Sequence, residues 1–137
     1  MIASFVWRDG LRAQLEREAK LAYPQECCGL IEGAREGGTA RAMALHPTRN
    51  LSTNNDHFEI DPSEHIRLMR EARGRGAEII GCYHSHPNGH AGPSERDREG
   101  AGETGFIWLI ASLDGDRPIA MNAYRYEGGV FMPLVLA

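Results

Sequence analysis

The feature that most constrains the fold is the apolar run 79–83, which is followed directly by His84-Ser85-His86-Pro87. The short, partly β-branched run predicts a buried strand, and Pro87 ends it because proline has no N–H to donate. Successive side chains of a strand point to opposite faces, so His84 and His86 should project together while Ser85 points away. Two adjacent imidazoles at the end of a core strand can form one edge of a metal site, although such a pair also occurs on ordinary strands.

A third candidate ligand follows in the segment Ser94-Glu95-Arg96-Asp97, directly after Pro93. Its Ser-x-x-acid pattern predicts the start of a helix and, taken alone, favours an ordinary capping box. Residues three apart are neighbours on a helix, so Ser94 and Asp97 should share one face. The short loop after Pro87 allows that face to fold back over the histidines, where Asp97 would complete a set of metal ligands.

The complete spacing is His-Ser-His-Pro, six residues, Ser, two residues, Asp, and it resembles the JAMM motif of the MPN (Mov34/PAD-1) metalloprotease family. That family also needs an upstream glutamate, and the segment 24–30 resembles the family's glutamate segment with Glu26 at that position. Without the histidine motif, Glu26 would be interpreted as an ordinary surface carboxylate. The resemblance covers most of the chain, including the Phe58–Pro62 segment.

The resemblance implies a zinc enzyme with His84, His86 and Asp97 as ligands. It assigns Glu26 the role of general base for an attacking water and Ser94 that of hydrogen-bond donor to the developing oxyanion. Iron or manganese would also suit two histidines and a carboxylate, but zinc is the metal of the family's peptidases.

The same resemblance implies a substrate. Family members cut peptide or isopeptide bonds after the C-terminal tail of ubiquitin or a ubiquitin-like protein. This compact chain is most similar to small bacterial members, which are associated with ubiquitin-like sulfur carrier proteins. We therefore expect a metallopeptidase that cuts after a Gly-Gly tail, with a small β-grasp protein as partner.

Three alternatives compete with this interpretation. A non-catalytic MPN scaffold would bind partners only, but scaffold members usually lack the metal ligands. A zinc deaminase would need His-x-Glu together with Pro-Cys-x-x-Cys, and the chain lacks this combination. A cysteine nucleophile at Cys27 or Cys28 is disfavoured because one of two adjacent strand residues must face the core. The loop residue His90 is expected to be solvated rather than a spare ligand.

Length and composition bound the remaining possibilities. The 137 residues are typical of one domain, spanning 1–137, and the net charge of −4 gives no basic excess that would suggest nucleic-acid binding. No apolar run is long enough to suggest a membrane span, and the N-terminus does not resemble a secretory signal. The odd count of three cysteines indicates no disulfide framework, so a reducing cytoplasm fits best.

Hydrophobic periodicity predicts two main helices, the second opening at Asp61-Pro62 with Asp61 as its cap. We therefore expect an α+β fold (an α/β sandwich), with a curved, mostly antiparallel sheet flanked by these helices. The resemblance implies the same architecture, the MPN/JAMM (cytidine-deaminase-like) fold. The expected helices are 9–22 and 62–74, and the expected strands are 2–7, 28–33, 40–45, 57–60, 79–86, 106–112, 119–126 and 130–136.

Overall fold

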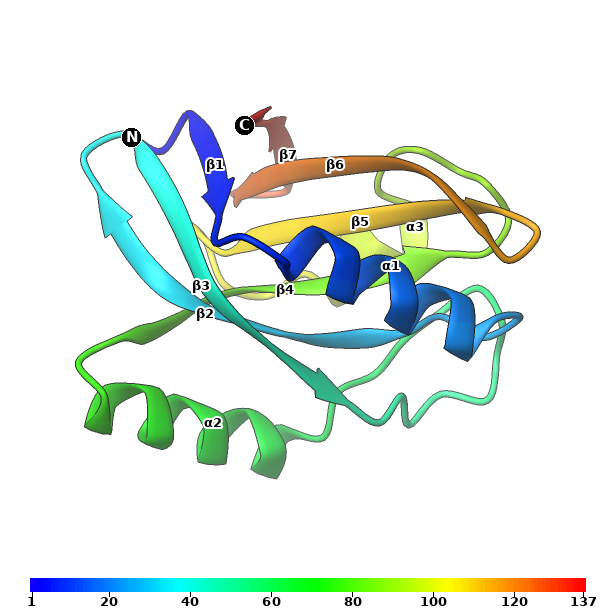
Figure 1. The fold of residues 1–137 in the computed structure, drawn as a ribbon, viewed down its shortest axis with the longest axis horizontal. Coiled ribbons are helices and arrows are strands. Elements are labelled where there is room, and N and C mark those ends of the chain that lie inside the picture. The colour runs from blue at the N-terminus through cyan, green and yellow to red at the C-terminus, as the bar shows by residue number, and fades with distance from the viewer.

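The computed structural model describes residues 1–137, which form one eight-stranded sheet in the order β7-β6-β5-β4-β2-β3-β1-β8 (Figure 1). Four of the seven strand pairings are antiparallel, so the expected curved, mostly antiparallel sheet is confirmed. The strands are β1 (Ser4–Trp7), β2 (Cys28–Glu36), β3 (Thr39–Thr48), β4 (Glu78–His86), β5 (Ile107–Asp114), β6 (Arg117–Glu127), β7 (Val130–Pro133) and β8 (Val135–Leu136).

The two expected main helices are present, and a short third helix follows the histidine strand. They are α1 (Leu11–Ala22), α2 (Pro62–Gly74) and α3 (Glu95–Gly100). The carboxylate of Asp61 caps α2 by accepting a hydrogen bond from the backbone N–H of Ser63 at 2.9 Å, as its sequence predicted. None of the helices combines the length and the apolar character that a membrane crossing requires.

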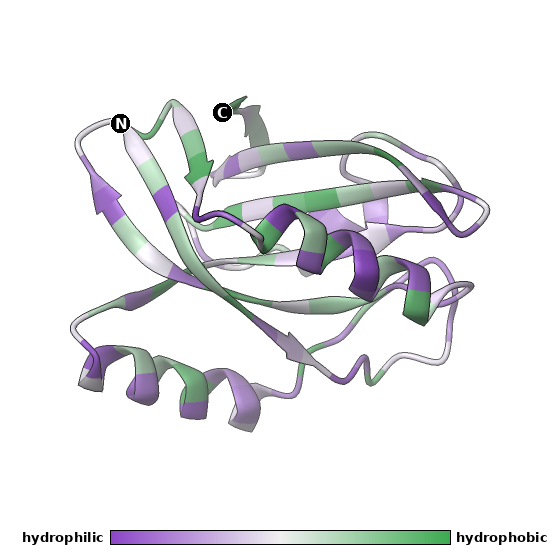
Figure 2. Ribbon diagram, viewed as in Figure 1, coloured by the Kyte–Doolittle hydropathy of each residue, from purple (hydrophilic) through white to green (hydrophobic).

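The sheet separates two hydrophobic cores of unequal size. The larger contains 19 buried residues and includes the apolar side of α1, whereas the smaller contains seven and includes the apolar side of α2. Figure 2 shows the hydrophobic stretch of β5. Within β5, Trp108 belongs to the smaller core and Leu109 to the larger one. Trp108 is buried in that smaller core.

An irregularity in the pairing of β2 with β4 decides which face each side chain of β4 occupies. The register shifts by one residue between Ile31 and Glu32, so Ile80 has no direct partner and forms a β-bulge. Ile79 and Cys82, three residues apart, consequently lie in the same core on the α2 side, while Ile80 lies in the α1 core. Beyond the bulge, both motif histidines continue on the α2 side.

The prediction of a strand at 57–60 was wrong. This segment pairs with no strand, because a loop side chain takes up its backbone hydrogen bonds. The Asn50 amide donates to the carbonyl of His57 at 3.1 Å and accepts from the N–H of Glu59 at 3.0 Å. The N–H of Leu51 donates to the Glu59 carbonyl at 2.9 Å. A strand neighbour is therefore not needed to satisfy this backbone.

Other boundaries also differ from the sequence prediction. Residues 130–136 form two strands rather than one, because β7 pairs with β6 and β8 pairs with β1 at the other edge of the sheet. Between them, Leu134 turns into the α1 core and its N–H donates to the carbonyl of Ala123. The strand β3 also continues to Thr48, three residues beyond the expected end at residue 45.

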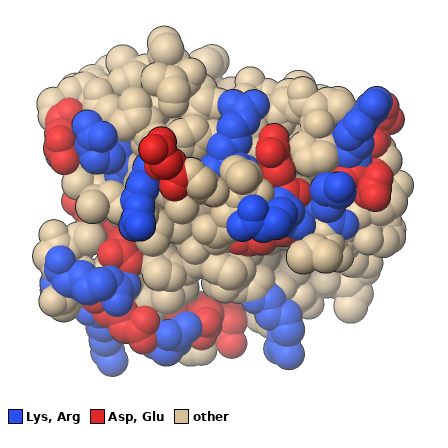
Figure 3. Space-filling model, viewed as in Figure 1, with Lys and Arg blue, Asp and Glu red and all other residues tan.

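Charges of both signs are interspersed over the face seen in Figure 3, with no large area of a single sign. On α2, for example, Arg67 pairs with Glu64 in the preceding turn and with Glu71 in the following one. Such exposed pairs along a helix contribute little to stability, because water screens the charges.

Candidate metal centre and its cleft

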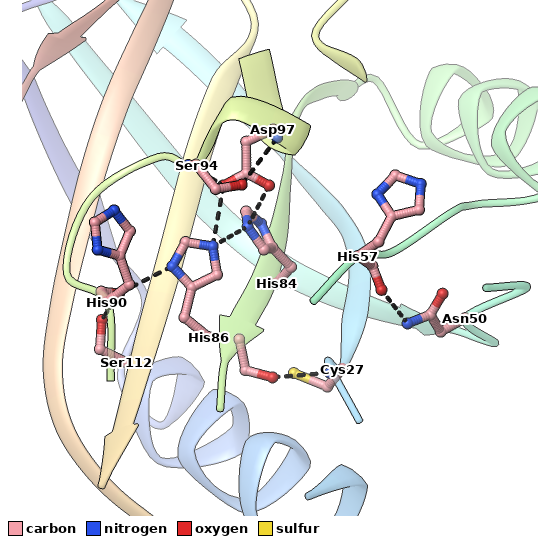
Figure 4. A network of polar contacts seen from close by, with 10 residues as sticks. Cys27, Asn50, His57, His84, His86, His90, Ser94, Asp97 and Ser112 are labelled. Atoms are coloured by element: carbon pink, nitrogen blue, oxygen red, sulfur yellow. Dashed lines mark hydrogen bonds and ion pairs between the residues drawn. The ribbon is translucent and has the colours of Figure 1, made fainter. Parts of the chain in front are cut away.

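Three ligand-type side chains converge where β4 ends and α3 begins (Figure 4). The Nε2 atoms of His84 and His86 lie 3.0 Å apart. Asp97 places Oδ1 3.1 Å from Nε2 of His84 and Oδ2 3.0 Å from Nε2 of His86. All three side chains are buried. The strand and the helix start therefore meet as the sequence spacing indicated.

The spacing of these atoms fits a divalent cation. An ion with tetrahedral bonds of about 2.0–2.1 Å holds neighbouring ligand atoms about 3.3 Å apart, close to the distances between these side chains. Two imidazole nitrogens and one carboxylate oxygen also form a donor set that catalytic zinc and non-haem iron sites use. The residues present are thus compatible with a metal in both geometry and chemistry.

The carboxylate of Asp97 has a second role as a helix cap. Its Oδ2 accepts a hydrogen bond from the N–H of Ser94 at 2.9 Å, and the hydroxyl of Ser94 accepts one from the N–H of Asp97 at 3.0 Å. This reciprocal pair is a capping box, as the ordinary interpretation of the sequence predicted. The cap also fixes the carboxylate in the orientation that faces the histidines.

For two of the three groups, the shift in pKa favours the protonation state that binds a metal. Burial would raise the pKa of Asp97, but its hydrogen bonds to the two histidines outweigh burial and hold that pKa well below its usual range. Burial lowers the pKa of His84, which favours the neutral imidazole that binds metals. Burial would also lower the pKa of His86, but the contact with Asp97 outweighs burial and raises that pKa.

A backbone carbonyl sets the orientation of the His86 ring. Nδ1 of His86 lies 2.9 Å from the carbonyl oxygen of His90, so this nitrogen is the donor and Nε2 is left for the ligand group. The same oxygen accepts a hydrogen bond from the Ser112 hydroxyl at 2.9 Å (Figure 4). The His90 side chain itself is exposed, as expected. No sequence pattern marks this contact, because every residue has a backbone carbonyl.

An aromatic side chain holds the other histidine. The ring of Phe58 stacks on the ring of His84, with centroids 4.4 Å apart and planes inclined by 22°. Trp108 presents its edge to the same imidazole at 5.7 Å. Nδ1 of His84 has no hydrogen-bond partner, so packing rather than hydrogen bonding orients this ring. Sequence reasoning missed the role of Phe58 because it assigned the residue to a strand.

Glu26 lies at the edge of the same site, just before β2. The N–H of Cys27 donates to the Ser85 hydroxyl at 2.8 Å, and the N–H of Ser85 donates back to the Cys27 carbonyl at 3.2 Å. The Asn50 amide donates to the Glu26 carbonyl at 3.0 Å. Ser85, which points away from the other motif side chains, thus joins the strand carrying the histidines to the segment carrying the glutamate.

The Glu26 side chain is buried, and its Oε1 has no hydrogen-bond partner. Burial raises the pKa of this carboxyl from 4.5 to about 8. Together with His86 and Ser94, Glu26 lines a cleft of about 230 Å³ that has no hydrophobic lining residue. An unpartnered carboxylate oxygen beside a ligand cluster is unusual for a purely structural residue.

The adjacent cysteines do not form a competing site. Both are buried, and burial raises the pKa of Cys27 to about 12 and that of Cys28 above its ordinary value. The reactive thiolate is therefore disfavoured at neutral pH. The expectation against a cysteine nucleophile agrees with this environment.

The fold and the ligand cluster together define a class of protein. In this class, a domain with an MPN-type α+β sheet carries a candidate metal centre that opens into a polar cleft. Residues 8–126 match the family described as prokaryotic homologs of the JAB domain, and the chain belongs to that family. It is also similar to a crystal structure of a JAB1/MPN domain protein from Archaeoglobus fulgidus, with a TM-score of 0.58 and 20% identity over 98% of this chain and 97% of that one. This likeness confirms the expected fold.

Two relatives of known name extend the comparison. The chain is 32% identical over 131 residues to a desampylase of Haloferax volcanii. The matched region covers 95% of this chain and 90% of that protein. It is 33% identical over 109 residues to a probable TtuB-protein conjugate cleaving protease of Thermus thermophilus, covering 77% of this chain and 66% of that one.

Proposed function

We propose that this protein is a zinc-dependent metallopeptidase. Its reaction is hydrolysis of a peptide or isopeptide bond after the Gly-Gly tail of a ubiquitin-like or sulfur carrier protein. The observation that carries the proposal is the convergence of three buried ligand atoms beside an unpartnered carboxylate oxygen in a polar cleft. The names of the two relatives support the same reaction class.

In this proposal the metal ligands are His84, His86 and Asp97. A zinc ion held by them would supply Lewis-acid activation of water and positive charge that favours the ionised form of a nearby carboxylate. The chain contributes the positioning: the His90 carbonyl directs the His86 ring, Phe58 packs the His84 ring, and the helix cap directs Asp97.

The proton transfers are assigned to Glu26. Its Oε1 is free of hydrogen bonds within the fold, so it can accept a proton from the attacking water and return it to the leaving amine. The Ser94 hydroxyl already accepts a hydrogen bond from the N–H of Asp97, which leaves its own hydrogen free to be donated into the cleft. We assign that hydrogen to the carbonyl oxygen of the substrate, where negative charge develops.

The test combines metal content with cleavage of a carrier protein fused through Gly-Gly to a reporter. Glu26→Gln should keep the ion and the fold, because it removes only the proton acceptor, while turnover falls on the order of 10²-fold or more. The control is Glu99→Gln, an exposed change on α3 outside the cleft lining, which should leave turnover unchanged.

Two results would contradict the proposal. Reconstituted wild-type protein that holds no stoichiometric ion would remove the metal mechanism. A fully active Glu26→Gln variant would remove Glu26 from the proton transfers. Chelation should also lower the melting temperature, because an ion that binds only the folded state stabilises it by mass action.

A further inference from the structure

Two cavities of opposite character meet at the start of α3. The first has a volume of about 400 Å³, and aromatic side chains form much of its wall, among them Phe58, Phe106 and Trp108. The second is the polar cleft of about 230 Å³ that contains Glu26. Asp97 lines the apolar cavity and its cap partner Ser94 lines the polar cleft, so the candidate metal centre lies between the two.

Arg96 lines both cavities, and it is the one lysine or arginine in the lining of either. Its side chain is exposed and makes no hydrogen bond or ion pair within the chain. The next arginine along the helix is different, since Arg98 bonds to Glu95 at 3.2 Å and lies over the ring of Phe131. The guanidinium of Arg96 therefore keeps all of its donors available for a ligand that crosses from one cavity to the other.

The lining of each cavity indicates which end of such a ligand it would hold. The polar cleft includes the carboxylates of Asp56 and Glu95, and these favour a leaving amine that becomes a cation after release. The apolar cavity offers aromatic surface to the side chains of the acyl segment. A substrate that fills both cavities accordingly carries its last acyl residues past Arg96.

We propose that Arg96 is the residue that positions the acyl segment, by donating hydrogen bonds to its backbone carbonyl oxygens where it passes from the apolar cavity into the polar cleft. This inference rests on the proposed function. A glycine-rich tail has no side chains near the scissile bond, so its last residues can be recognised only through their backbone. The planar guanidinium is well suited to that task because it presents several N–H donors in a fixed arrangement.

The experiment compares Arg96→Gln and Arg96→Lys with wild type on two substrates. One is the full carrier fusion, which can fill both cavities, and the other is a minimal Gly-Gly acyl substrate with the same leaving amine. The matched control is Arg70→Gln on α2, where an exposed and unpaired arginine lines neither cavity.

Arg96→Gln should lower kcat/KM for the fusion by about 10- to 100-fold, the worth of a charge-assisted hydrogen bond, mainly through KM. Arg96→Lys should restore part of the loss, because it keeps the charge but not the planar arrangement of donors. The affinity for a carrier-tail peptide, measured by calorimetry, should fall in parallel. Arg70→Gln should behave as wild type, and none of these exposed changes should alter the melting temperature.

Three outcomes would overturn the inference. The first is an unchanged kcat/KM for the fusion in Arg96→Gln. The second is a loss in kcat alone with unchanged binding of the tail peptide, since that would assign Arg96 to the chemical step. The third requires the minimal substrate in two forms, with the carboxylate of its leaving group either free or amidated: a loss seen only with the free carboxylate would place the contact on the amine side. Wild-type protein that cleaves neither substrate would instead overturn the proposed function.

Discussion

The two faces of the sheet are built differently, although they share the same strands. The face under α1 is a continuous apolar core, with Leu15, Ile31 and Tyr83 fully or almost fully buried. The face under α2 and α3 has a smaller core, beside which lie a cavity of about 400 Å³ and a buried cluster of two histidines and an aspartate. Buried polar groups and open volume both lower stability, so the α1 face must supply much of the free energy that holds the other face in place.

This difference separates stability from function within one strand. Neighbouring residues of β4 serve opposite faces: Tyr83 belongs to the α1 core and His84 to the ligand cluster. Changes on the α1 face should therefore lower the free energy of unfolding, and changes on the other face should alter ion binding and turnover.

The largest effect is expected from His84→Ala, which removes a ligand. Ion affinity should fall by more than the roughly 10–100-fold that loss of an outer hydrogen-bond partner costs. The matched control is His90→Ala, because the exposed His90 ring, 5.9 Å from that of His86, is not a ligand, and the change keeps the backbone carbonyl that contacts His86. Metal analysis after dialysis measures both variants, and equal ion content in them would contradict the ligand assignment.

The next largest effect lies on the opposite face. Leu15→Ala creates a cavity at a fully buried position, so the free energy of unfolding should fall by about 2–5 kcal/mol. Leu21→Ala on the same helix changes a side chain that is 86% exposed and should stay within about 0.5 kcal/mol of wild type. Denaturant unfolding gives both values. A loss of ion affinity in folded Leu15→Ala protein would show that the faces are not separable.

A smaller effect, on both properties, is expected for Ser85→Ala. The change leaves the buried N–H of Cys27 without its side-chain acceptor, at a cost of about 1–3 kcal/mol, and loosens the adjacent Glu26. Turnover should therefore fall together with stability. The control is Ser4→Ala, which loses a hydrogen bond to Thr39 far from the site and should leave turnover unchanged. Wild-type turnover in Ser85→Ala would exclude Ser85 as a positioning residue.

The smallest effect is a pH dependence at Glu32. Hydrogen bonds from Arg75, at 2.6 and 3.1 Å, hold the pKa of Glu32 below its ordinary value of 4.5. A lowered folded-state pKa stabilises the protein fully above the unfolded value, and this stabilisation is lost as the pH falls through the folded pKa. The stability difference between wild type and Glu32→Gln should thus shrink as the pH drops below about 4.5.

Unfolding curves at neutral pH and at several acidic values test this prediction. The control is Glu78→Gln, since Glu78 forms only an exposed pair with Arg35 at 3.6 Å. A stability difference for Glu32→Gln that stays constant across this range would contradict the assignment of a lowered pKa.

The sequence predicted the parts of the site that depend on local periodicity. Residues two apart on a regular stretch of strand share a face, which places His84 beside His86. The capping box of Ser94 and Asp97 is equally local, because its hydrogen bonds span one helical turn. Glu26 lies far away in sequence, so its position beside the histidines followed only from the family resemblance.

Contacts that depend on distant loops were not predictable in this way. The side chain of Asn50 replaces a strand partner for residues 57–59, and nothing in the local pattern distinguishes that arrangement from a true strand. The stacking of Phe58 on His84 follows from it and was missed for the same reason. The division of 130–136 into two strands likewise depends on pairing with opposite edges of the sheet.

The bulge at Ile80 determines on which face of the sheet the side chains of the histidine motif lie. The face on which each later side chain of β4 lies depends on that one unpaired residue. If the same residues alternated regularly from Ile79 without the bulge, the imidazoles would turn into the α1 core and the serine hydroxyl would point toward Asp97. The histidine motif therefore places its side chains at the metal site only because a bulge outside the motif shifts the alternation of the strand by one residue.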